Sequence, residues 1–408
     1  MTQNRVVITG LGIWSCLGTT LEEVRQSLYE GKSGIVASQE RIDAGFRSPL
    51  TADVPRPDLK PLIPRNQRQF LPEEAQYAYM ATRDALLSAR LDQDYIEQHE
   101  VGIVYGNDSV AEATMLALDK FRQAGSTAAC GSGAIFQSMN STVTMNLACL
   151  FHLKGINLTA SAACASGSHS IGLGALLIRN GLQECIVCGG AQEANMYGVA
   201  SFDGIQSFAL NDDPVKASRP FDRDRNGLVP GGGAATVILE SYEHAVRRGA
   251  PILAEIIGWG FSGNGDHIST PNIAGPARSL QLCMMDAGVQ PRDIGYVNAH
   301  ATSTKIGDAR EAQAISQVFG DYRVPVTSTK SQTGHEMWMA GASEIIYSLL
   351  MMKNNFIAGS INFENPDDET ACINVLPETR EARFDMFLSN SFGFGGTNST
   401  LIIKDYKN

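Results

Sequence analysis

The chain has 408 residues, of which 43% are apolar and 18% are charged, and its formal net charge at neutral pH is -11. These values exclude a disordered protein, because the chain is long and apolar enough to bury one large core or two fused ones. They also argue against a nucleic-acid binder or a protein that adheres to anionic membranes. We expect a cytoplasmic protein without a membrane span, since residues 1–10 begin a strand pattern and show no export signal.

Strands and helices alternate through the first half of the chain. Apolar strand patterns occur at residues 5–12, 101–106, 184–190 and 234–240. Helix patterns cover residues 20–30, 74–91 and 165–180, and the first begins with a capping box made by Thr20 and Glu23. Residues 126–143 are small and polar with few charges, which predicts packed loops near an interface or a pocket.

The second half repeats this order of elements. Strands are predicted at residues 252–260, 294–300, 324–329 and, on both sides of a glycine loop, 387–403. Helices are predicted at residues 277–287, 308–319 and 342–353. We therefore predict an α/β fold with internal pseudo-symmetry, in which residues 1–250 form one half and residues 251–408 the other.

The eight cysteines lack the spacing of a disulfide framework, and we expect reduced thiols. Cys185 and Cys188 form a Cys-x-x-Cys inside an apolar strand without a nearby histidine, which argues against a metal or redox site. Cys164 differs, because it follows a strand-like run and precedes small residues that open a helix. A helix start favours the thiolate form of a cysteine. A buried structural cysteine is the alternative that this local sequence leaves open.

Three further segments end predicted strands and carry reactive or glycine-rich groups. They contain His300, then Lys330 and His335, and finally Phe394 within Asn-Ser-Phe-Gly-Phe-Gly-Gly-Thr-Asn. In layered α/β folds, ligands and catalytic groups gather in loops past the carboxyl ends of strands. We expect the other five histidines to lie at the surface or in the core.

Together these motifs resemble those of the β-ketoacyl-acyl-carrier-protein synthases, most closely the elongating type with one cysteine and two histidines. The resemblance keeps the same order over essentially the whole chain. It implies the thiolase-like fold, a duplicated five-layer α/β/α/β/α arrangement that is usually a homodimer. It also implies no metal and no cofactor, because phosphopantetheine arrives on the acyl carrier protein.

The resemblance implies a decarboxylating Claisen condensation between an acyl group held on a cysteine and malonyl-acyl-carrier protein. Cys164 matches the acyl-accepting cysteine. His300 and His335 match the histidines that hydrogen-bond the malonyl thioester oxygen as enolate charge develops. Lys330 matches the lysine that orders the site, and we expect Glu344 to be its partner.

The C-terminal glycine loop matches the family's oxyanion hole and gate. The backbone amide of Phe394 is expected to complete the oxyanion hole with the amide of the nucleophile, and its side chain to act as the gate between Gly393 and Gly395. Thr302 and Thr304 match the threonines that contact pantetheine.

A basic, proline-broken loop stands out in this acidic chain. Lys60, Arg65 and Arg68 lie where the synthases use basic residues to dock an acidic carrier protein. Asn66 occupies a position that is basic in the type I synthases, so we expect the details of docking to differ.

The sequence also departs from the usual family pattern. After His335 it reads Glu-Met-Trp-Met-Ala-Gly-Ala, so that Trp338 stands where a glycine is usual, and Leu228 stands where an aromatic residue is common. This version resembles the ketosynthases of aryl-polyene clusters, which extend conjugated polyenes and can pair with a cysteine-less chain-length subunit. Elongation of fatty acids and of aryl polyenes or other polyketides are therefore both open, and so are a homodimer and a heterodimer.

Two other functions fit this sequence less well. A thiolase-type, coenzyme-A-dependent acyltransferase fits less well, because the C-terminal glycine loop has Phe394 and no second reactive cysteine. A non-catalytic chain-length subunit fits less well, because such subunits lack the nucleophile that Cys164 provides.

Overall fold

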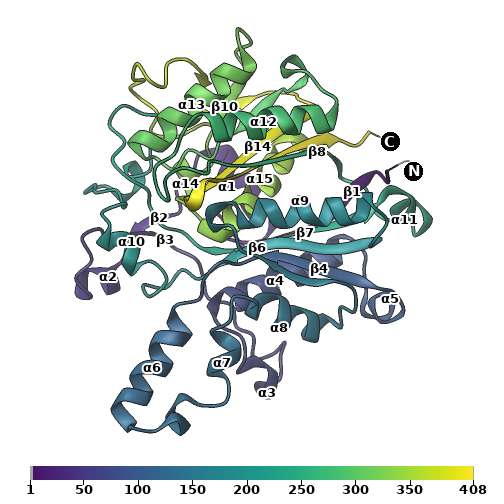
Figure 1. Ribbon diagram of the computed structural model, residues 1–408, viewed down its shortest axis with the longest axis vertical. Coiled ribbons are helices and arrows are strands. Elements are labelled where there is room, and N and C mark those ends of the chain that lie inside the picture. Colours follow the sequence, from purple (N-terminus) through teal and green to yellow (C-terminus); the bar gives the residue numbers. More distant parts are fainter. Residues whose placement is uncertain (1–2, 408) are drawn as a thin grey trace.

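The computed structural model describes residues 3–407, and eleven of its strands form one continuous mixed sheet (Figure 1). Five of these strands come from the first half: β1 (Val6–Trp14), β4 (Val101–Gly106), β5 (Asn157–Ala160), β6 (Cys185–Gln192) and β7 (Gly233–Ser241). Six come from the second half: β8 (Ala254–Gly263), β9 (Tyr296–Asn298), β10 (Pro325–Thr327), β12 (Asn374–Val375), β14 (Met386–Gly393) and β15 (Thr397–Asp405).

The strand order shows that the fold is duplicated. In the first half the order is β5-β4-β6-β7-β1, with β4 parallel to both neighbours and the other pairs antiparallel. The order β10-β9-β14-β15-β8 repeats these positions and directions in the second half. The two five-stranded units join where Val6 to Ile8 of β1 pair with Ala254 to Ile256 of β8. The predicted pseudo-symmetry is confirmed, while the exact boundary at residue 250 stays a prediction.

Helices divide the molecule into five layers (Figure 1). The helices α9 (Ser166–Arg179) and α15 (Ala340–Lys353) lie between the strands of the two halves. The outer face of the first half is covered by α4 (Glu73–Ser88) and α8 (Thr142–Phe151), and that of the second by α12 (Ala274–Ala287) and α13 (Lys305–Phe319). All but two residues of α15 are buried, which explains its apolar sequence. The expected thiolase-like α/β/α/β/α arrangement is confirmed.

Close packing of one outer helix on each half is made possible by glycine. A Cβ atom on Gly12 of β1 would lie 1.9 Å from the carbonyl oxygen of Ala81 on α4. A Cβ atom on Gly260 of β8 would lie 2.1 Å from the carbonyl oxygen of Ser279 on α12. The two halves thus use the same device at equivalent strands, because only glycine lets a helix approach this closely.

Shorter elements complete the described chain. The helices are α1 (Leu21–Glu30), α2 (Gln39–Asp43), α3 (Arg65–Arg68), α5 (Gln93–Gln98), α6 (Glu112–Ala124), α7 (Ala134–Gln137), α10 (Ala200–Gly204), α11 (Tyr242–Arg247) and α14 (Lys330–Thr333). The strands are β2 (Ile35–Ala37), β3 (Leu50–Ala52), β11 (Phe356–Ile357) and β13 (Arg380–Glu381). The predicted capping box of Thr20 and Glu23 is present at α1. Within residues 3–407, no helix has the length and apolar composition needed to cross a membrane.

One region differs from its prediction. Helix α6 was not predicted, and it forms with residues 126–141 an arm that projects from the layered body (Figure 1). Much of this arm is exposed, and none of its residues lines the cavity described below. The prediction of packed loops beside a pocket is therefore wrong for this segment, while the alternative of an interface stays a prediction. Several large apolar side chains of the arm stay exposed instead of forming a core.

Candidate active site

Cys164 lies in a tight turn between β5 and α9. The turn is a single 3-10 segment (Ala163–Ala165), and Ala163 has a left-handed backbone with φ of 47°. This conformation is strained for alanine. Ser166 stabilises it, because its hydroxyl accepts the N–H of Ala162 at 2.8 Å and donates to the carbonyl of Ala163 at 2.7 Å. The result is a nucleophile turn that presents the thiol at the edge of the sheet.

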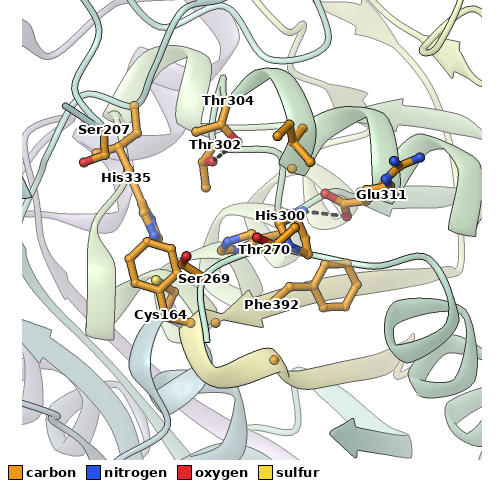
Figure 2. Close-up of a pocket in the computed structure, with 18 of the residues that line it drawn as sticks. Cys164, Ser207, Ser269, Thr270, His300, Thr302, Thr304, Glu311, His335 and Phe392 are labelled. Carbon is orange, nitrogen blue, oxygen red and sulfur yellow. Dashed lines mark hydrogen bonds between the residues drawn. The ribbon is translucent and has the colours of Figure 1, made fainter. Parts of the chain in front are cut away.

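A cavity of about 560 Å³ leads to this thiol. Its walls come from the loop after β9, the loop of residues 264–272, and the turn between β14 and β15. Figure 2 shows Cys164, His300 and His335 along this cavity, with Thr302 and Thr304 farther along the loop that carries His300. The motifs that were predicted from separate strand ends therefore meet in one place.

The thiol and the two imidazoles form a close group. The Sγ atom of Cys164 and one ring nitrogen from each of His300 and His335 lie within 4.8 Å of one another. The two rings are 5.2 Å apart between centroids and nearly perpendicular, at 87°. All three side chains are buried. Nδ1 of His300 and both ring nitrogens of His335 have no hydrogen-bond partner among residues 3–407, so they are available to a ligand.

Both histidines are uncharged. Burial is the largest cause, and it lowers the pKa of His300 and of His335 well below the ordinary 6.5. The positive charge of Lys330 lowers both pKa values further. Each neutral ring therefore offers one N–H donor and one acceptor nitrogen.

Burial keeps the thiol of Cys164 protonated at neutral pH. Burial raises its pKa to about 12, although the charge of Lys330 and the backbone N–H groups of Phe394 and of Cys164 itself act in the opposite direction. The backbone N–H groups favour the thiolate, as expected for a helix start, but desolvation of the buried thiol outweighs them, so the expectation of a net thiolate is wrong. Reaction requires a base that removes this proton.

Lys330 and Glu344 form a buried ion pair beneath the histidines, the pairing expected from the resemblance. Lys330 begins α14 and Glu344 lies on α15. Burial raises the pKa of Glu344, and the lysine opposes this rise. A second buried acid, Glu336, receives hydrogen bonds from Ser343 at 2.5 Å and from Tyr347 at 2.8 Å.

The turn after β14 carries Phe394, which is 40% exposed. Its ring stacks on Phe202 with centroids 6.1 Å apart and planes 15° apart. Gly395 has a left-handed φ of 78°, which favours glycine. Its N–H donates to the carbonyl of Ile268 at 2.6 Å, so this turn is tied to the opposite wall of the cavity. Gly393, on the other side of the ring, also lines the cavity.

The predicted docking residues lie outside the cavity. Lys60 and Arg65 are exposed. Arg68 is half-buried and donates from Nη1 to the carbonyl of Ile63 at 3.1 Å, so part of its role is structural. The segment contacts the base of the projecting arm, because the rings of Phe70 and Phe136 pack edge to face at 5.4 Å.

Sequence reasoning missed one functional residue. Glu311 of α13 is buried and accepts the N–H groups of His300 at 2.9 Å and Ala301 at 2.7 Å (Figure 2). It also accepts from Nδ2 of Asn390 at 3.0 Å. The carboxylate thereby fixes the loop that carries His300. The signal for it was a pair of acids, Asp308 and Glu311, three residues apart among the apolar residues of one helix face.

The two departures from the family pattern pack around the nucleophile. Trp338 and Leu228 belong with Cys164, Phe208 and Met337 to one buried apolar cluster. The indole Nε1 of Trp338 has no partner among residues 3–407. The sequence had singled out both positions without assigning a role, and the structure places them beside the thiol.

Comparisons with known proteins agree with this geometry. The sequence pattern of the beta-ketoacyl synthase N-terminal domain matches residues 3–245, and that of the C-terminal domain matches residues 253–364. The chain is 40% identical over 408 residues to 3-oxoacyl-(acyl-carrier-protein) synthase 1 of Haemophilus influenzae, covering 98% of this chain and 99% of the relative.

Solved structures show the same similarity. A β-ketoacyl synthase from Burkholderia phymatum has a TM-score of 0.95 and 35% identity, covering 99% of this chain and 100% of that one. The ishigamide ketosynthase/chain length factor has a TM-score of 0.90 and 32% identity, with the same coverage. With two domain patterns in chain order and this extent of identity, the chain belongs to the β-ketoacyl synthase family.

Proposed function

We propose that the protein joins an acyl chain held on Cys164 to malonyl-acyl-carrier protein in a decarboxylating Claisen condensation. The observation that carries this proposal is the group of one thiol and two neutral imidazoles within 4.8 Å, reached through a cavity of about 560 Å³. The name of the Haemophilus influenzae relative, a 3-oxoacyl-(acyl-carrier-protein) synthase, supports it.

The first step transfers the acyl chain to the enzyme. The sulfur of Cys164 attacks the thioester carbonyl, and its proton passes through a neutral imidazole to the departing phosphopantetheine thiolate. Because the pKa of the thiol is about 12, this transfer needs the adjacent ring nitrogen. The backbone N–H groups of Cys164 and Phe394 would form the oxyanion hole; both lower the pKa of the thiol, which supports this role.

The second step forms the carbon–carbon bond. The bond between malonyl C2 and its carboxylate breaks, carbon dioxide leaves, and the electron pair forms the enolate of the thioester. N–H donors from His300 and His335 stabilise the enolate oxygen, since each neutral ring carries one N–H and has ring nitrogens without a partner. The enolate carbon attacks the acyl carbon, and the sulfur of Cys164 leaves and recovers a proton.

Lys330 acts on this step through the histidines. Its charge is one cause of their lowered pKa, so it helps to keep both rings neutral. Glu344 balances the buried ammonium group. We assign positioning roles to both residues, and to Glu311 through the loop of His300.

The substrates arrive on an acyl carrier protein. The hydroxyls of Thr302 and Thr304 lie 3.2 Å apart on the cavity wall, where they suit the amides of a pantetheine arm. The ring of Phe394 would act as the gate. Lys60, Arg65 and Arg68 supply positive charge for an acidic carrier protein.

We assign the arm and the edge strand β5 to a subunit interface. The arm exposes Met115, Phe121, Ile135 and Phe136, and β5 ends the sheet with Leu158 45% exposed. Apolar surface beside an open sheet edge is typical of an interface. The occupant is a second copy or a chain-length-factor-like subunit, which native mass spectrometry with and without candidate partners would distinguish.

The reaction needs no metal or further cofactor, since the acyl group and the malonyl group both arrive as thioesters. We place it in the cytoplasm, where thiols stay reduced, in agreement with eight unpaired cysteines.

The test uses purified protein with malonyl-acyl-carrier protein and acyl-carrier proteins that bear saturated or polyenoic chains. Mass spectrometry should show an acyl group on Cys164 and then a β-ketoacyl product that is two carbons longer. The preferred primer decides between fatty-acid and polyene elongation. Absence of any acyl-Cys164 adduct would contradict the proposal and favour a non-catalytic subunit.

A further inference from the structure

Two cations line the cavity at its outer end. Lys305 is exposed at the first residue of α13, and Arg310 is half-buried on the same helix. Among the residues that line this cavity, Glu311 is the only acid, and its carboxylate is buried and bonded to backbone N–H groups. In a chain of net charge -11, this wall is therefore locally positive.

Neither cation has an acidic partner within residues 3–407. Arg310 donates from Nη1 to the side chain of Gln313 at 3.0 Å, which is a neutral acceptor. Nearby arginines behave differently, because Arg225 pairs with Asp367 at 2.5 Å and Arg219 pairs with Glu364 at 3.2 Å. The cavity cations are thus available to an external anion.

Both charges lie on the cavity wall, within the first two turns of α13. Arg310 follows Ile306 by four residues, so both lie on one face of α13, and both line the cavity. Side chains on a helix slant toward its N-terminus, which directs the guanidinium of Arg310 back toward the turn that holds Lys305. Asp308, the acid of this turn, points inward and accepts the N–H of Phe221 at 2.8 Å.

A third donor faces them from the opposite loop. Nδ1 of His267 accepts the backbone N–H groups of Ser269 and Thr270, each at 3.1 Å. The proton of the neutral ring therefore resides on Nε2. His267 is exposed and lines the cavity, so this N–H is open to a ligand.

The loop between His300 and Lys305 runs from the reaction centre to the surface. His300 is buried, Thr302 and Thr304 are half-buried, and Lys305 is exposed. These residues follow the order of groups in a pantetheine thioester. His300 would lie at the reacting carbonyl, the threonines at the amides and Lys305 at the terminal phosphate.

We propose that Lys305 and Arg310 form a phosphate subsite for the ester at the end of the pantetheine arm. This inference rests on the function proposed above, because it assigns the outer end of the same substrate. The shared chemistry is a pantetheine phosphate, which occurs as a phosphodiester on a carrier protein and as a pyrophosphate in coenzyme A. Arginine and lysine both bind phosphate through charge-assisted hydrogen bonds.

The kinetic test compares malonyl-phosphopantetheine with malonyl-pantetheine, which lacks the phosphate. We expect the native protein to favour the phosphorylated substrate by about tenfold in kcat/KM, the size of one partly exposed charge-assisted contact. Lys305→Gln with Arg310→Gln should reduce this ratio to about one, and added salt should shrink it in the native protein. Lys404→Ala, an exposed lysine near the far end of β15, is the matched control and should leave the ratio unchanged.

Two further substrates identify the source of the phosphate. If the subsite serves the carrier protein, the double variant loses about tenfold with malonyl-carrier protein. If it serves coenzyme A, the larger loss occurs with malonyl-coenzyme A. Both results support a pantetheine phosphate subsite.

A binding measurement separates this inference from the proposed reaction. Calorimetry with the Cys164→Ala protein compares phosphopantetheine with pantetheine, and no chemistry is required. Tighter binding of phosphopantetheine that disappears in the double variant supports the subsite even if condensation fails. Equal binding of the two ligands, or a preference that survives the double variant, overturns it even if condensation proceeds.

Discussion

The two halves of the molecule contain the same turn with different residues in it. In the first half, Ala163 has φ of 47° and precedes Cys164 at the start of α9. In the second half, Met337 has φ of 46° and precedes Trp338 at the start of α15. Cys164 and Trp338 are each 6% exposed and share one apolar cluster. The duplicated fold thus contains two equivalent strained turns, and both contribute a residue to the lining of one cavity.

The difference between the turns shows how the halves divide the work. The first turn supplies the nucleophile. The second supplies Met337 to the cavity wall and is preceded by His335 and the buried acid Glu336. Three residues before Cys164 stands Ser161, whose hydroxyl donates to the carbonyl of Asn107 at 2.8 Å. Three residues before Trp338 stands His335, whose ring nitrogens are open to a ligand. The two turns therefore share their backbone geometry, and they differ in the side chains that give each turn its chemical role.

Removal of the nucleophile should produce the largest effect. We expect Cys164→Ala to lower the rate of β-ketoacyl product formation by roughly 10⁴-fold or more, because covalent capture of the acyl chain is lost. Product mass spectrometry and circular dichroism would measure rate and folding. Cys188→Ala, in the buried strand β6, is the matched control and should retain elongation. A normal rate for Cys164→Ala would exclude the covalent mechanism.

Removal of a histidine should have the next largest effect. His335→Ala should lower the condensation rate by about 10² to 10³-fold, since one donor to a developing oxyanion is worth about 3 kcal/mol. His300→Ala should behave similarly. Ser161→Ala, at the equivalent place in the first turn, should stay within a few-fold of the native rate. An equal loss of condensation rate in Ser161→Ala and His335→Ala would show that the two turns do not differ in function.

Much of this arrangement could be predicted from sequence, because it follows from local patterns. Glycine-ended strands and the capping box of Thr20 give the alternating elements, and strand ends locate Cys164, His300 and His335. What failed depended on three-dimensional burial. The pKa of Cys164 rises because of surrounding atoms that no short window contains. Helix α6 was missed because its apolar residues stay exposed on the arm.

Glu336 is a titratable group in the second turn, so it makes the unfolding free energy depend on pH. The first turn has no such carboxyl group, because Ala162 occupies the equivalent position. Burial raises the pKa of Glu336 to about 7 from an ordinary 4.5. The folded protein therefore holds a proton that the unfolded chain releases. This contribution is complete below pH 4.5 and is lost as the pH rises to 7, by about 3 kcal/mol.

Glu336→Gln should remove that dependence, and the difference in unfolding free energy between native protein and variant isolates it. The buried histidines act with the opposite sign, because their lowered pKa values reduce stability as the pH falls below 6.5. Their effect is common to both proteins. Chemical denaturation between pH 4.5 and 7.5 would measure the unfolding free energy of both proteins. If the two plots of unfolding free energy against pH ran parallel, a role for Glu336 would be refuted.

Exchange of Trp338, which packs in the apolar cluster of Cys164, tests what the second turn contributes. Trp338→Leu should lower the unfolding free energy by about 2 kcal/mol through lost packing, and it also removes an indole N–H that has no partner. Because Trp338 packs in the cluster around Cys164, the profile of accepted acyl chains should shift toward wider ones. Elongation rates across linear and branched primers would measure this. An unchanged profile would make Trp338 a purely structural residue.

The strain of the turn itself should give the smallest effect. Ala163→Gly relieves a left-handed conformation that costs an alanine about 1 kcal/mol, while glycine adds about 0.5 to 1 kcal/mol of unfolded-state entropy. The net change in unfolding free energy should therefore be within about 0.5 kcal/mol. Ala165→Gly, at φ of -93°, has no strain to relieve and should lose about 1 kcal/mol. An equal loss of unfolding free energy at both positions would show that the left-handed turn before Cys164 is unstrained. The turns at Ala163 and Met337 would then share a backbone conformation but not a stored strain.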